Sequence, residues 1–139
     1  MRNASLFLTW SLRSLILIGI LLVTPSCASD DQSDMHLLTP KDVVAQRTKT
    51  PNLKIVDVRT PEEFAAGHIE GAMLINWNDP KFEQLISALD KSQPTLVYCA
   101  VGGRSGKAYT KLKQMGFNQL FDMKGGFDAW KKDKLPIAY

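Results

Sequence analysis

The stretch LVYCAVGGRSGKA, residues 96–108, places a cysteine where an anion-binding loop is expected. An apolar run ends at Cys99, two glycines follow, and Arg104 and Ser105 open a predicted helix. Successive backbone N–H groups in such a loop can turn inward and bind an anion, and glycines permit the positive φ angles that this requires. The N-terminus of the helix adds roughly half a positive charge. We therefore expect Cys99 to ionise readily.

A lone cysteine at the end of a strand is most often a small core residue, so packing is the first alternative. Packing alone does not require two glycines and a cation directly after the cysteine. We therefore interpret Cys99 as a nucleophile and Arg104 as a cation that supports it. The loop expected to surround the sulfur contains Ala100, Val101, Gly102, Gly103 and Ser105.

The segments around this loop alternate between strands and helices. Strands are predicted at residues 53–58, 71–77, 95–99 and 119–123, and the apolar runs at 53–58 and 95–99 are typical of buried strands. Helices are expected at residues 40–47, 61–64, 79–90, 105–115 and 127–132. Short connections between alternating elements predict an α/β fold with a mainly parallel sheet and helices on both faces. Ligands of such sheets bind beyond the carboxyl ends of the strands, where Cys99 lies.

Three of the predicted helices begin at a Thr-Pro or Asp-Pro pair. In each pair the first residue is expected to cap the helix and the proline to be its first residue, starting from Thr39, Thr60 and Asp79. Glu63 stands three residues after its cap, as in a capping box. In the third of these helices a core-facing stripe is predicted from the spacing of Phe82, Leu85, Ile86 and Leu89.

Five motifs in a fixed order resemble those of rhodanese-like domains, which are sulfurtransferases. They are DVRTPEEF with Asp57 and Arg59, GHIEGA at residues 67–72, the VYC strand, the loop from Cys99 to Ser105, and KGGFDAW at residues 124–130. GGFDAW or DVR alone would be a weak signal, but the ordered set is strong and specific. The resemblance covers residues 39–139.

The resemblance implies a double displacement. The Cys99 thiolate would take a sulfane sulfur from a donor, become a persulfide and pass the outer sulfur to a nucleophile. The donor would be thiosulfate or a persulfide, the acceptor a thiol or cyanide, and a thioredoxin-like protein is a further candidate partner. No metal or organic cofactor is implied. Many members that use thiosulfate carry a basic or polar residue where this chain has Ala100 and Val101, which leaves the donor open, and Glu70 replaces a proline that is frequent in the family.

The same resemblance suggests supporting roles for other residues. Arg104 is expected to stiffen the loop by bonding backbone carbonyls or Asp57. Asp57 is equally suited to pair with Arg59, and the sequence leaves both readings open. His68 is expected to be structural, packing with Ile69 in a turn. The expected fold determinants are Gly125, Gly126, Phe127 and the core residue Trp130.

Two other functions use a cysteine in such a loop. Phosphatases of the cell-cycle type share the fold, but their loop has one more residue between cysteine and arginine, so the four residues here favour a single sulfur over a phosphate. A binding or redox-sensing module would instead oxidise the thiolate or bind a partner with it. Inactive relatives usually lack the cysteine, which favours the enzyme.

The first residues differ in kind from the rest. Arg2 and Arg13 precede an apolar run at residues 15–23 that is too short to span a bilayer, so residues 1–26 are interpreted as a signal peptide rather than a core helix. Cys27 resembles the lipidated cysteine of bacterial lipoproteins, although the residues just before it depart from that pattern. The alternative is an ordinary secretory signal.

These features predict an exported protein, periplasmic or at the cell surface, held to the membrane by a lipid on Cys27. Residues 27–38 would form a flexible tether and residues 39–139 the rhodanese-like domain. Without residues 1–26 the chain has 15 basic and 14 acidic residues, and this near-neutral balance argues against a nucleic-acid partner. Two cysteines provide no disulfide framework, so Cys99 is expected to be a free thiol.

Overall fold

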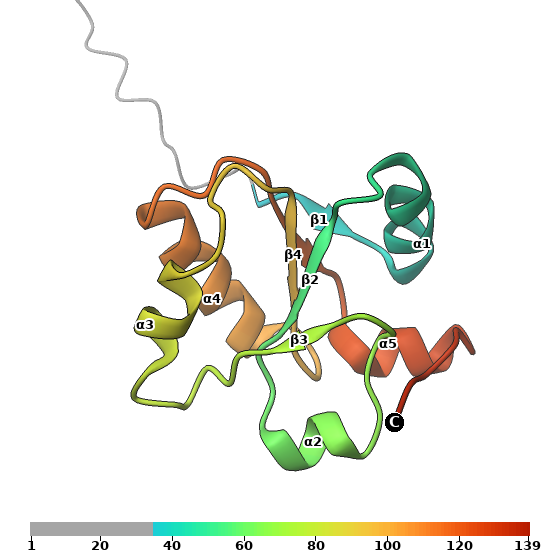
Figure 1. Cartoon of the computed structure of the whole chain (residues 1–139). Coiled ribbons are helices and arrows are strands. Elements are labelled where there is room, and N and C mark those ends of the chain that lie inside the picture. Colours follow the sequence, from blue (N-terminus) through green and yellow to red (C-terminus); the bar gives the residue numbers. More distant parts are fainter. Residues whose placement is uncertain (1–34) are drawn as a thin grey trace, which may run out of the picture. The chain divides into compact units, whose positions relative to one another are not determined.

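A parallel sheet of five strands forms the centre of the structure, a computed structural model that describes residues 35–139 (Figure 1). The strands lie in the order β1-β5-β4-β2-β3, and neighbouring strands are parallel. This confirms the predicted α/β class, with one strand more than expected. In chain order the elements are β1 (Leu37–Leu38), α1 (Pro40–Lys49), β2 (Lys54–Asp57), α2 (Pro61–Ala65), β3 (Met73–Leu74), α3 (Phe82–Ser87), β4 (Thr95–Tyr98), α4 (Gly103–Gln114), β5 (Leu120–Met123) and α5 (Gly126–Lys132).

Helices cover both faces of the sheet, and each face has its own cluster of buried apolar side chains (Figure 1). The cluster under α3 and α4 includes Val97 and Leu112, and the cluster under α1 and α5 includes Leu96 and Trp130. Leu96 and Val97 are neighbours in β4, where successive side chains point to opposite faces, so one strand serves both clusters. This explains why the central strands read as unbroken apolar runs rather than alternating ones.

The register of the central strands places one acidic residue in a buried row. Val56 of β2 pairs with Val97 of β4, which pairs with Asp122 of β5. Asp122 is 3% exposed. A carboxyl group therefore lies at the sheet, next to the strand that leads to Cys99.

Two of the three predicted helix starts are confirmed. Thr39 and Thr60 each accept a hydrogen bond from the backbone N–H three residues on, and the acid at that position bonds back to the capping residue, which completes a capping box. The third start is wrong, because α3 begins at Phe82. The Asp79 carboxylate accepts a hydrogen bond from the N–H of Lys81 at 2.8 Å, which holds this segment in a turn before the helix.

The apolar stripe predicted for that helix is narrower than expected. Phe82 and Ile86 are buried and Leu89 packs against the core, but Leu85 is 45% exposed. α3 has only six residues, and Phe82 and Ile86, four residues apart, are its buried positions. The expectation for Leu85 is therefore wrong.

The chain joins the sheet earlier than predicted. Leu37 and Leu38, which were expected in the tether, form β1 at the edge of the sheet and pair with β5. The N–H of Asp122 donates to the carbonyl of His36 at 3.0 Å, and the N–H of Lys124 to that of Leu38 at 2.9 Å. A two-residue strand is too short to produce a sequence pattern. The predicted signal peptide, Cys27 and the tether up to residue 34 lie outside the described residues.

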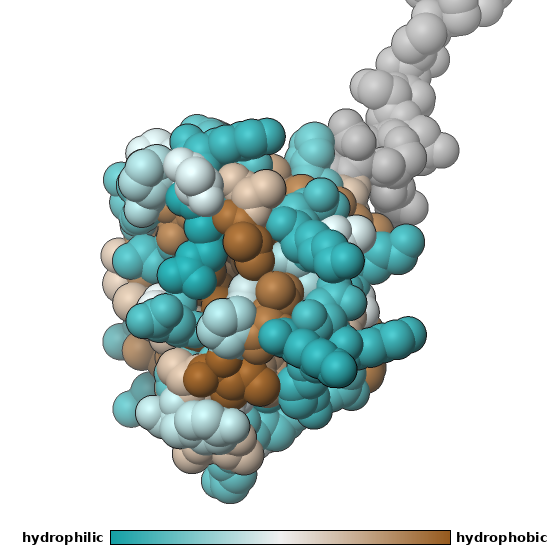
Figure 2. Space-filling model, turned by 90° about the vertical axis from the view of Figure 1, so that its right-hand side faces the viewer, coloured by the Kyte–Doolittle hydropathy of each residue, from teal (hydrophilic) through white to brown (hydrophobic). Residues whose placement is uncertain are grey.

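Figure 2 shows the face of the molecule that carries α1 and α5, where hydrophilic side chains surround hydrophobic ones near the middle. On this side a cavity of about 320 Å³ is lined by residues of α1 and α5 and of the chain after α5, among them Val44, Arg47, Trp130 and Leu135. None of its lining residues belongs to the cysteine loop. No helix between residues 35 and 139 combines the length and the apolar character needed to cross a bilayer.

Candidate active site

Cys99 lies directly after β4, at the bottom of the loop that leads into α4. It is a free thiol and its residue is 1% exposed. The N–H of Gly102 donates to the sulfur at 3.1 Å, and the N–H groups of Val101 and Ser105 and the Ser105 hydroxyl bond to it as well. Three of the predicted loop amides and one hydroxyl therefore converge on one atom.

These bonds decide the ionisation of the thiol. Burial of Cys99 raises the pKa of the thiol, but the hydrogen bonds from Ser105, Gly102 and Val101 favour the thiolate and together outweigh burial, so the pKa lies below its ordinary value. The expectation from sequence that the loop stabilises an anion is consistent with this geometry.

The two glycines of the loop have different conformations. Gly102 has φ of 114°, in the region that favours glycine, and is the N-cap of α4. Gly103 is the first residue of α4 and has no positive φ, so only Gly102 uses the conformational freedom that both glycines offer. A Cβ at Gly103 would meet no atom within 4 Å, so that side of the loop is open. The rim of the loop is apolar: Val101 is 67% exposed and Ala100 partly exposed.

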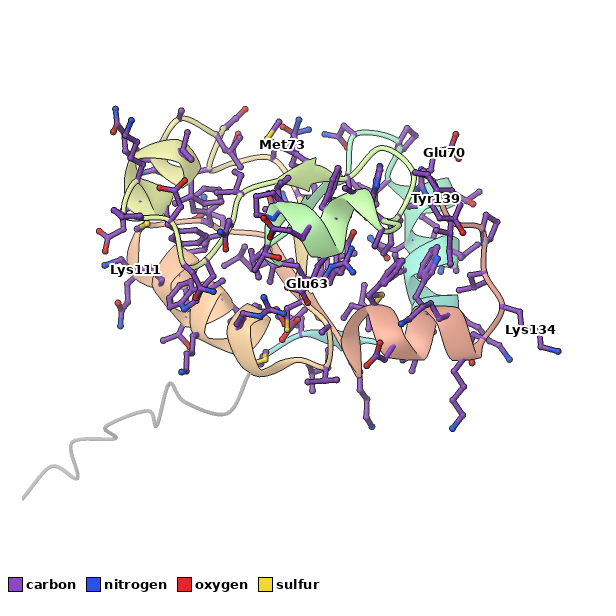
Figure 3. All side chains as sticks on the ribbon, turned by 90° about the horizontal axis from the view of Figure 1, so that it is seen from below. Glu63, Glu70, Met73, Lys111, Lys134 and Tyr139 are labelled. Atoms are coloured by element: carbon purple, nitrogen blue, oxygen red, sulfur yellow. The ribbon has the colours of Figure 1, made fainter. Side chains whose placement is uncertain are left out.

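Arg104 does not bond Asp57, which corrects one of the two expectations for it. Its Nη1 and Nη2 donate to the two carboxylate oxygens of Glu63, each at 2.7 Å. Figure 3 views the sheet from the end where the strands finish, and Glu63 lies there among α2, α4 and α5. The bond to Arg104 lowers the pKa of Glu63 to about 2. The negative charges of Glu63 and, to a smaller extent, of Cys99 raise the pKa of Arg104.

Asp57 pairs with Arg59, which settles the alternative that the sequence left open. The closest contact, from Arg59 Nη2 to Asp57 Oδ2, is 2.6 Å, and the same nitrogen donates to the carbonyl of Gly67 at 2.8 Å. The guanidinium also lies over the ring of Phe127, 4.2 Å from its centre. Both charged residues are buried, so together they join β2, the turn at Gly67 and α5. These contacts are those of a structural ion pair.

The GGF segment at the start of α5 holds the base of the cysteine loop. The N–H of Phe127 donates to the carbonyl of Cys99 at 2.8 Å, and the N–H of Asp128 to that of Ala100 at 3.0 Å. Gly126 has φ of 58°, and a Cβ there would overlap the carbonyl oxygens of Cys99 and Ala100. Close approach of the two backbones therefore requires glycine at residue 126.

Of two further expectations about scaffold residues, that for Trp130 holds and that for His68 holds only in part. Trp130 is buried, and its Nε1–H donates to the carbonyl of Pro136 at 2.8 Å. His68 stacks on Phe64 with ring centres 3.7 Å apart, and its Nδ1 lies 3.1 Å from the Phe64 carbonyl. The side chain of His68 thus stacks on Phe64, whereas it was expected to pack with Ile69.

Two acidic residues near the site were missed as site residues. Glu63 was identified only as a capping residue, although it both caps α2 and binds Arg104. Asp122 was included in a predicted strand without comment, yet its side chain bonds to Ser105. An aspartate inside the apolar segment LFDM was the available signal, because buried carboxyls are rare without a partner.

The described residues do not provide a metal site. No three side chains of His, Cys, Asp or Glu between residues 35 and 139 lie close enough together to hold a metal ion. The chemistry that this site supports is that of a stabilised thiolate at an open loop.

Fold and site together define an α/β domain with an anion-binding cysteine loop at the carboxyl end of a parallel sheet. The sequence model of the rhodanese-like domain family matches residues 39–133. The chain therefore belongs to the rhodanese-like domain family, as its motifs suggested.

Relatives of the chain carry sulfurtransferase names. Thiosulfate sulfurtransferase 16, chloroplastic, of Arabidopsis thaliana is 41% identical over 93 residues, which cover 60% of this chain and 78% of that protein. Thiosulfate sulfurtransferase GlpE of Pseudomonas entomophila is 32% identical over 99 residues, 71% of this chain and 87% of that one. The solved polysulfide-sulfur transferase homodimer of Wolinella succinogenes has a TM-score of 0.63 and 28% identity, covering 75% of this chain and 78% of its own. The family-level function is sulfur transfer.

Proposed function

We propose that this protein is a sulfurtransferase in which Cys99 carries the transferred sulfur as a persulfide. The observation that carries the proposal is the convergence of three backbone N–H groups and the Ser105 hydroxyl on Cys99 Sγ. These donors stabilise a negative sulfur before and after it is loaded, because both the thiolate and the persulfide are anions.

The reaction consists of two displacements at sulfur. First, the Cys99 thiolate attacks the sulfane sulfur of the donor, so a new S–S bond forms and the donor's own bond to that sulfur breaks. With thiosulfate the leaving group is sulfite, which departs with the bonding electron pair. Second, a thiolate or cyanide attacks the outer sulfur of the persulfide, and the Cys99 thiolate leaves. No net oxidation or reduction of the enzyme occurs over the cycle.

Arg104 supports the loop without reacting. Its two bonds to Glu63 hold the first turn of α4 against α2, and its charge lies near the sulfur. A fixed cation in this place favours the anionic forms of Cys99 and attracts anionic donors.

The apolar rim points to the class of donor. Val101 is the most exposed large apolar side chain of the loop, and it offers neither charge nor a hydrogen bond to the sulfonate oxygens of thiosulfate. We therefore expect an organic persulfide or polysulfide to be a better donor than thiosulfate. The name of the Wolinella succinogenes relative, a polysulfide-sulfur transferase, is consistent with this preference. A small thiol or a thioredoxin-like protein is the proposed acceptor.

The proposed setting is outside the cytoplasm, with the domain held at a membrane by a lipid on Cys27. The support is the apolar run at residues 15–23 and its position just before Cys27. Several acyl chains would anchor the protein stably, since each buried methylene contributes about 0.8 kcal/mol.

The test of the proposed activity counts sulfur on Cys99. Purified protein is incubated with thiosulfate or with an organic persulfide, and its intact mass is measured before and after treatment with cyanide. We expect a gain of one sulfur that cyanide removes, and no gain in Cys99→Ser. A folded, reduced protein that gains no sulfur from either donor would overturn the proposal, and hydrolysis of an aryl phosphate that depends on Cys99 would replace it with a phosphatase.

A further inference from the structure

Asp122 is a buried carboxyl group that the sulfur-transfer steps do not use. It is 3% exposed, and its Oδ1 has no hydrogen-bond partner among the described residues. A buried carboxylate with an unsatisfied oxygen is costly, whereas a neutral carboxylic acid is much less so. In accord with this, burial raises the pKa of Asp122 to about 6, against the opposing hydrogen bonds from Ser105 and the Met123 N–H.

Ser105 stands between Asp122 and the sulfur. The residue is fully buried, and its hydroxyl donates to the carbonyl of Gly102 at 3.2 Å. Its side chain also lies close enough to Asp122 and to Cys99 to stabilise the negative charge of either group. A serine hydroxyl has one hydrogen to donate and can accept two. It cannot donate to a carboxylate, a thiolate and a carbonyl at once. If Asp122 carries a proton, it donates to Ser105 Oγ, and the serine hydrogen becomes available to the sulfur.

We propose that Asp122 and Cys99 share one proton through the hydroxyl of Ser105, so that Asp122 holds the proton that the Cys99 thiol gives up. In this exchange the S–H bond of Cys99 breaks and its proton joins Ser105 Oγ, while the O–H bond of Ser105 breaks and its proton joins Asp122. No electrons are transferred, and the total charge of the pair stays at one negative unit. Asp122 thus sets the pH at which the thiolate forms, and the inference rests on the proposed function only in taking the thiolate as the working form.

Other ionisable groups surround this pair on the elements packed against it. From α4, Tyr109 is buried and its hydroxyl lies 3.4 Å from the N–H of His36, whereas Lys107 is exposed. Before β1, the His36 ring packs near Phe121, 6.2 Å between ring centres. Arg104 is held by Glu63 and lies near the sulfur. Ser105 is the group that bonds to both Asp122 and Cys99, so the exchange is assigned to it.

The sign of the coupling follows from charge. At a pH above the pKa of Asp122, its carboxylate is negative and opposes formation of a second negative charge on Cys99. The second proton lost from the pair of groups therefore leaves at higher pH than it would if Asp122 were neutral. Asn in place of Asp122 is permanently neutral, and its amide can still donate to Ser105. Asp122→Asn should therefore make the thiol more acidic, although it removes a possible proton acceptor.

The first test measures the pH dependence of Cys99 alkylation by iodoacetamide, which needs no sulfur donor. Asp122→Asn should lower the midpoint by about one pH unit, which makes alkylation about fivefold faster one unit below the wild-type midpoint. When Asp122→Asn is made in the Ser105→Ala variant, the shift of the alkylation midpoint should be less than half as large. Glu83→Gln, an exposed acid that pairs with Lys111, is the charge-matched control and should leave the midpoint unchanged. An unshifted midpoint in Asp122→Asn would overturn the proposal.

The second test keeps Asp122 intact and follows its carboxyl group by infrared spectroscopy. The protonated-carboxyl band, assigned to aspartate by its shift on 13C labelling of this residue type, should disappear at lower pH in Cys99→Ser than in the wild type, because coupling is reciprocal and the serine carries no charge. The same midpoint in both proteins would contradict proton sharing even if Asp122→Asn folds poorly. Neither test depends on sulfur loading, so a wild-type protein that shares the proton but never gains sulfur would refute the proposed function alone.

Discussion

Arg104 and Glu63 form an ion pair with two hydrogen bonds, from Nη1 to Oε2 and from Nη2 to Oε1, each 2.7 Å long. The pair connects the first turn of α4, which follows the cysteine loop, to α2, which follows β2. Glu63 also accepts a hydrogen bond from the N–H of Thr60 at 3.0 Å. One carboxylate therefore fixes both the start of α2 and the arginine beside the sulfur.

This ion pair predicts a loss of stability in acid. The pKa of Glu63 falls from 4.5 to about 2 in the folded protein, chiefly through the bond to Arg104, so the stabilisation is complete above pH 4.5 and is lost as the pH falls from 4.5 to 2. Thermal unfolding midpoints between pH 2 and 6 should fall less steeply in Glu63→Gln than in the wild type. Glu70→Gln, an exposed acid outside the pair, should follow the wild type. Parallel curves for Glu63→Gln and the wild type would contradict the prediction.

Cys99 and Arg104 should differ in what their removal does to catalysis. Cys99→Ala should abolish transfer, whereas Arg104→Ala should leave an enzyme that still forms the persulfide but turns over about tenfold more slowly, since a charge-assisted contact contributes about 1.4 kcal/mol or more. The thiol pKa should also rise in Arg104→Ala, which moves the rate profile to higher pH. Arg104→Lys keeps the charge and loses the paired bonds, so it should retain the pH profile better than the rate. Equal loss in Cys99→Ala and Arg104→Ala would assign the arginine a chemical role instead.

Gly126 and Gly103 form a matched pair of substitutions. Gly126→Ala should destabilise the fold by about 3 kcal/mol or more, because the new methyl group meets the backbone of the cysteine loop and the residue is held at positive φ. Gly103→Ala meets no neighbour and lies in a helical conformation, so it should be neutral or stabilising by up to about 1 kcal/mol. Denaturant unfolding of both variants measures the difference. A tolerated Gly126→Ala would contradict the close packing of α5 on the loop.

A basic residue at the rim should change donor preference. Val101 is exposed, so Val101→Lys should fold normally and attract the thiosulfate dianion, raising kcat/KM for thiosulfate by about fivefold at low salt. The value for an uncharged organic persulfide should stay the same, which makes that donor the internal control. Val101→Gln tests whether polarity without charge suffices. If both donors respond equally to Val101→Lys, the rim does not select between them.

The proposed lipid anchor makes a prediction about Cys27. In a bacterial host that processes lipoproteins, the wild-type protein should fractionate with membranes and carry acyl groups by mass spectrometry, and Cys27→Ser should release it to the soluble fraction. Cys99→Ser should remain with the membranes, which separates the two cysteines. A wild-type chain without acyl groups would show that the anchor is absent.

Most of the fold was readable because its signals are local. The buried apolar runs and the Thr-Pro capping boxes each predict an element from a few adjacent residues. The failures came where local signals were weak or ambiguous. β1 is two residues long and is defined by its pairing with β5, and Asp79 bonds to Lys81 as a turn residue rather than as a helix cap.

The cysteine loop could be predicted from the sequence, but the residues that contact Arg104 and Ser105 could not. The cysteine loop is one continuous segment, so its residues and their order suggest their own arrangement. The partner of Arg104 is 41 residues away in the sequence, and of the two nearby acids, Asp57 was expected as the partner whereas Glu63 is the one that binds. Asp122 contacts Ser105 only because β5 lies beside β4, a neighbour relation that sequence order does not give.

The contact between α5 and the cysteine loop also has an electronic consequence. The peptide group that joins Ala100 to Val101 accepts a hydrogen bond at its oxygen from the N–H of Asp128 and donates its own N–H to Cys99 Sγ. Hydrogen bonds in such a chain polarise one another, so electron density drawn toward Asp128 makes the Val101 N–H a stronger donor. The thiolate is therefore stabilised in part from α5, through a single shared amide.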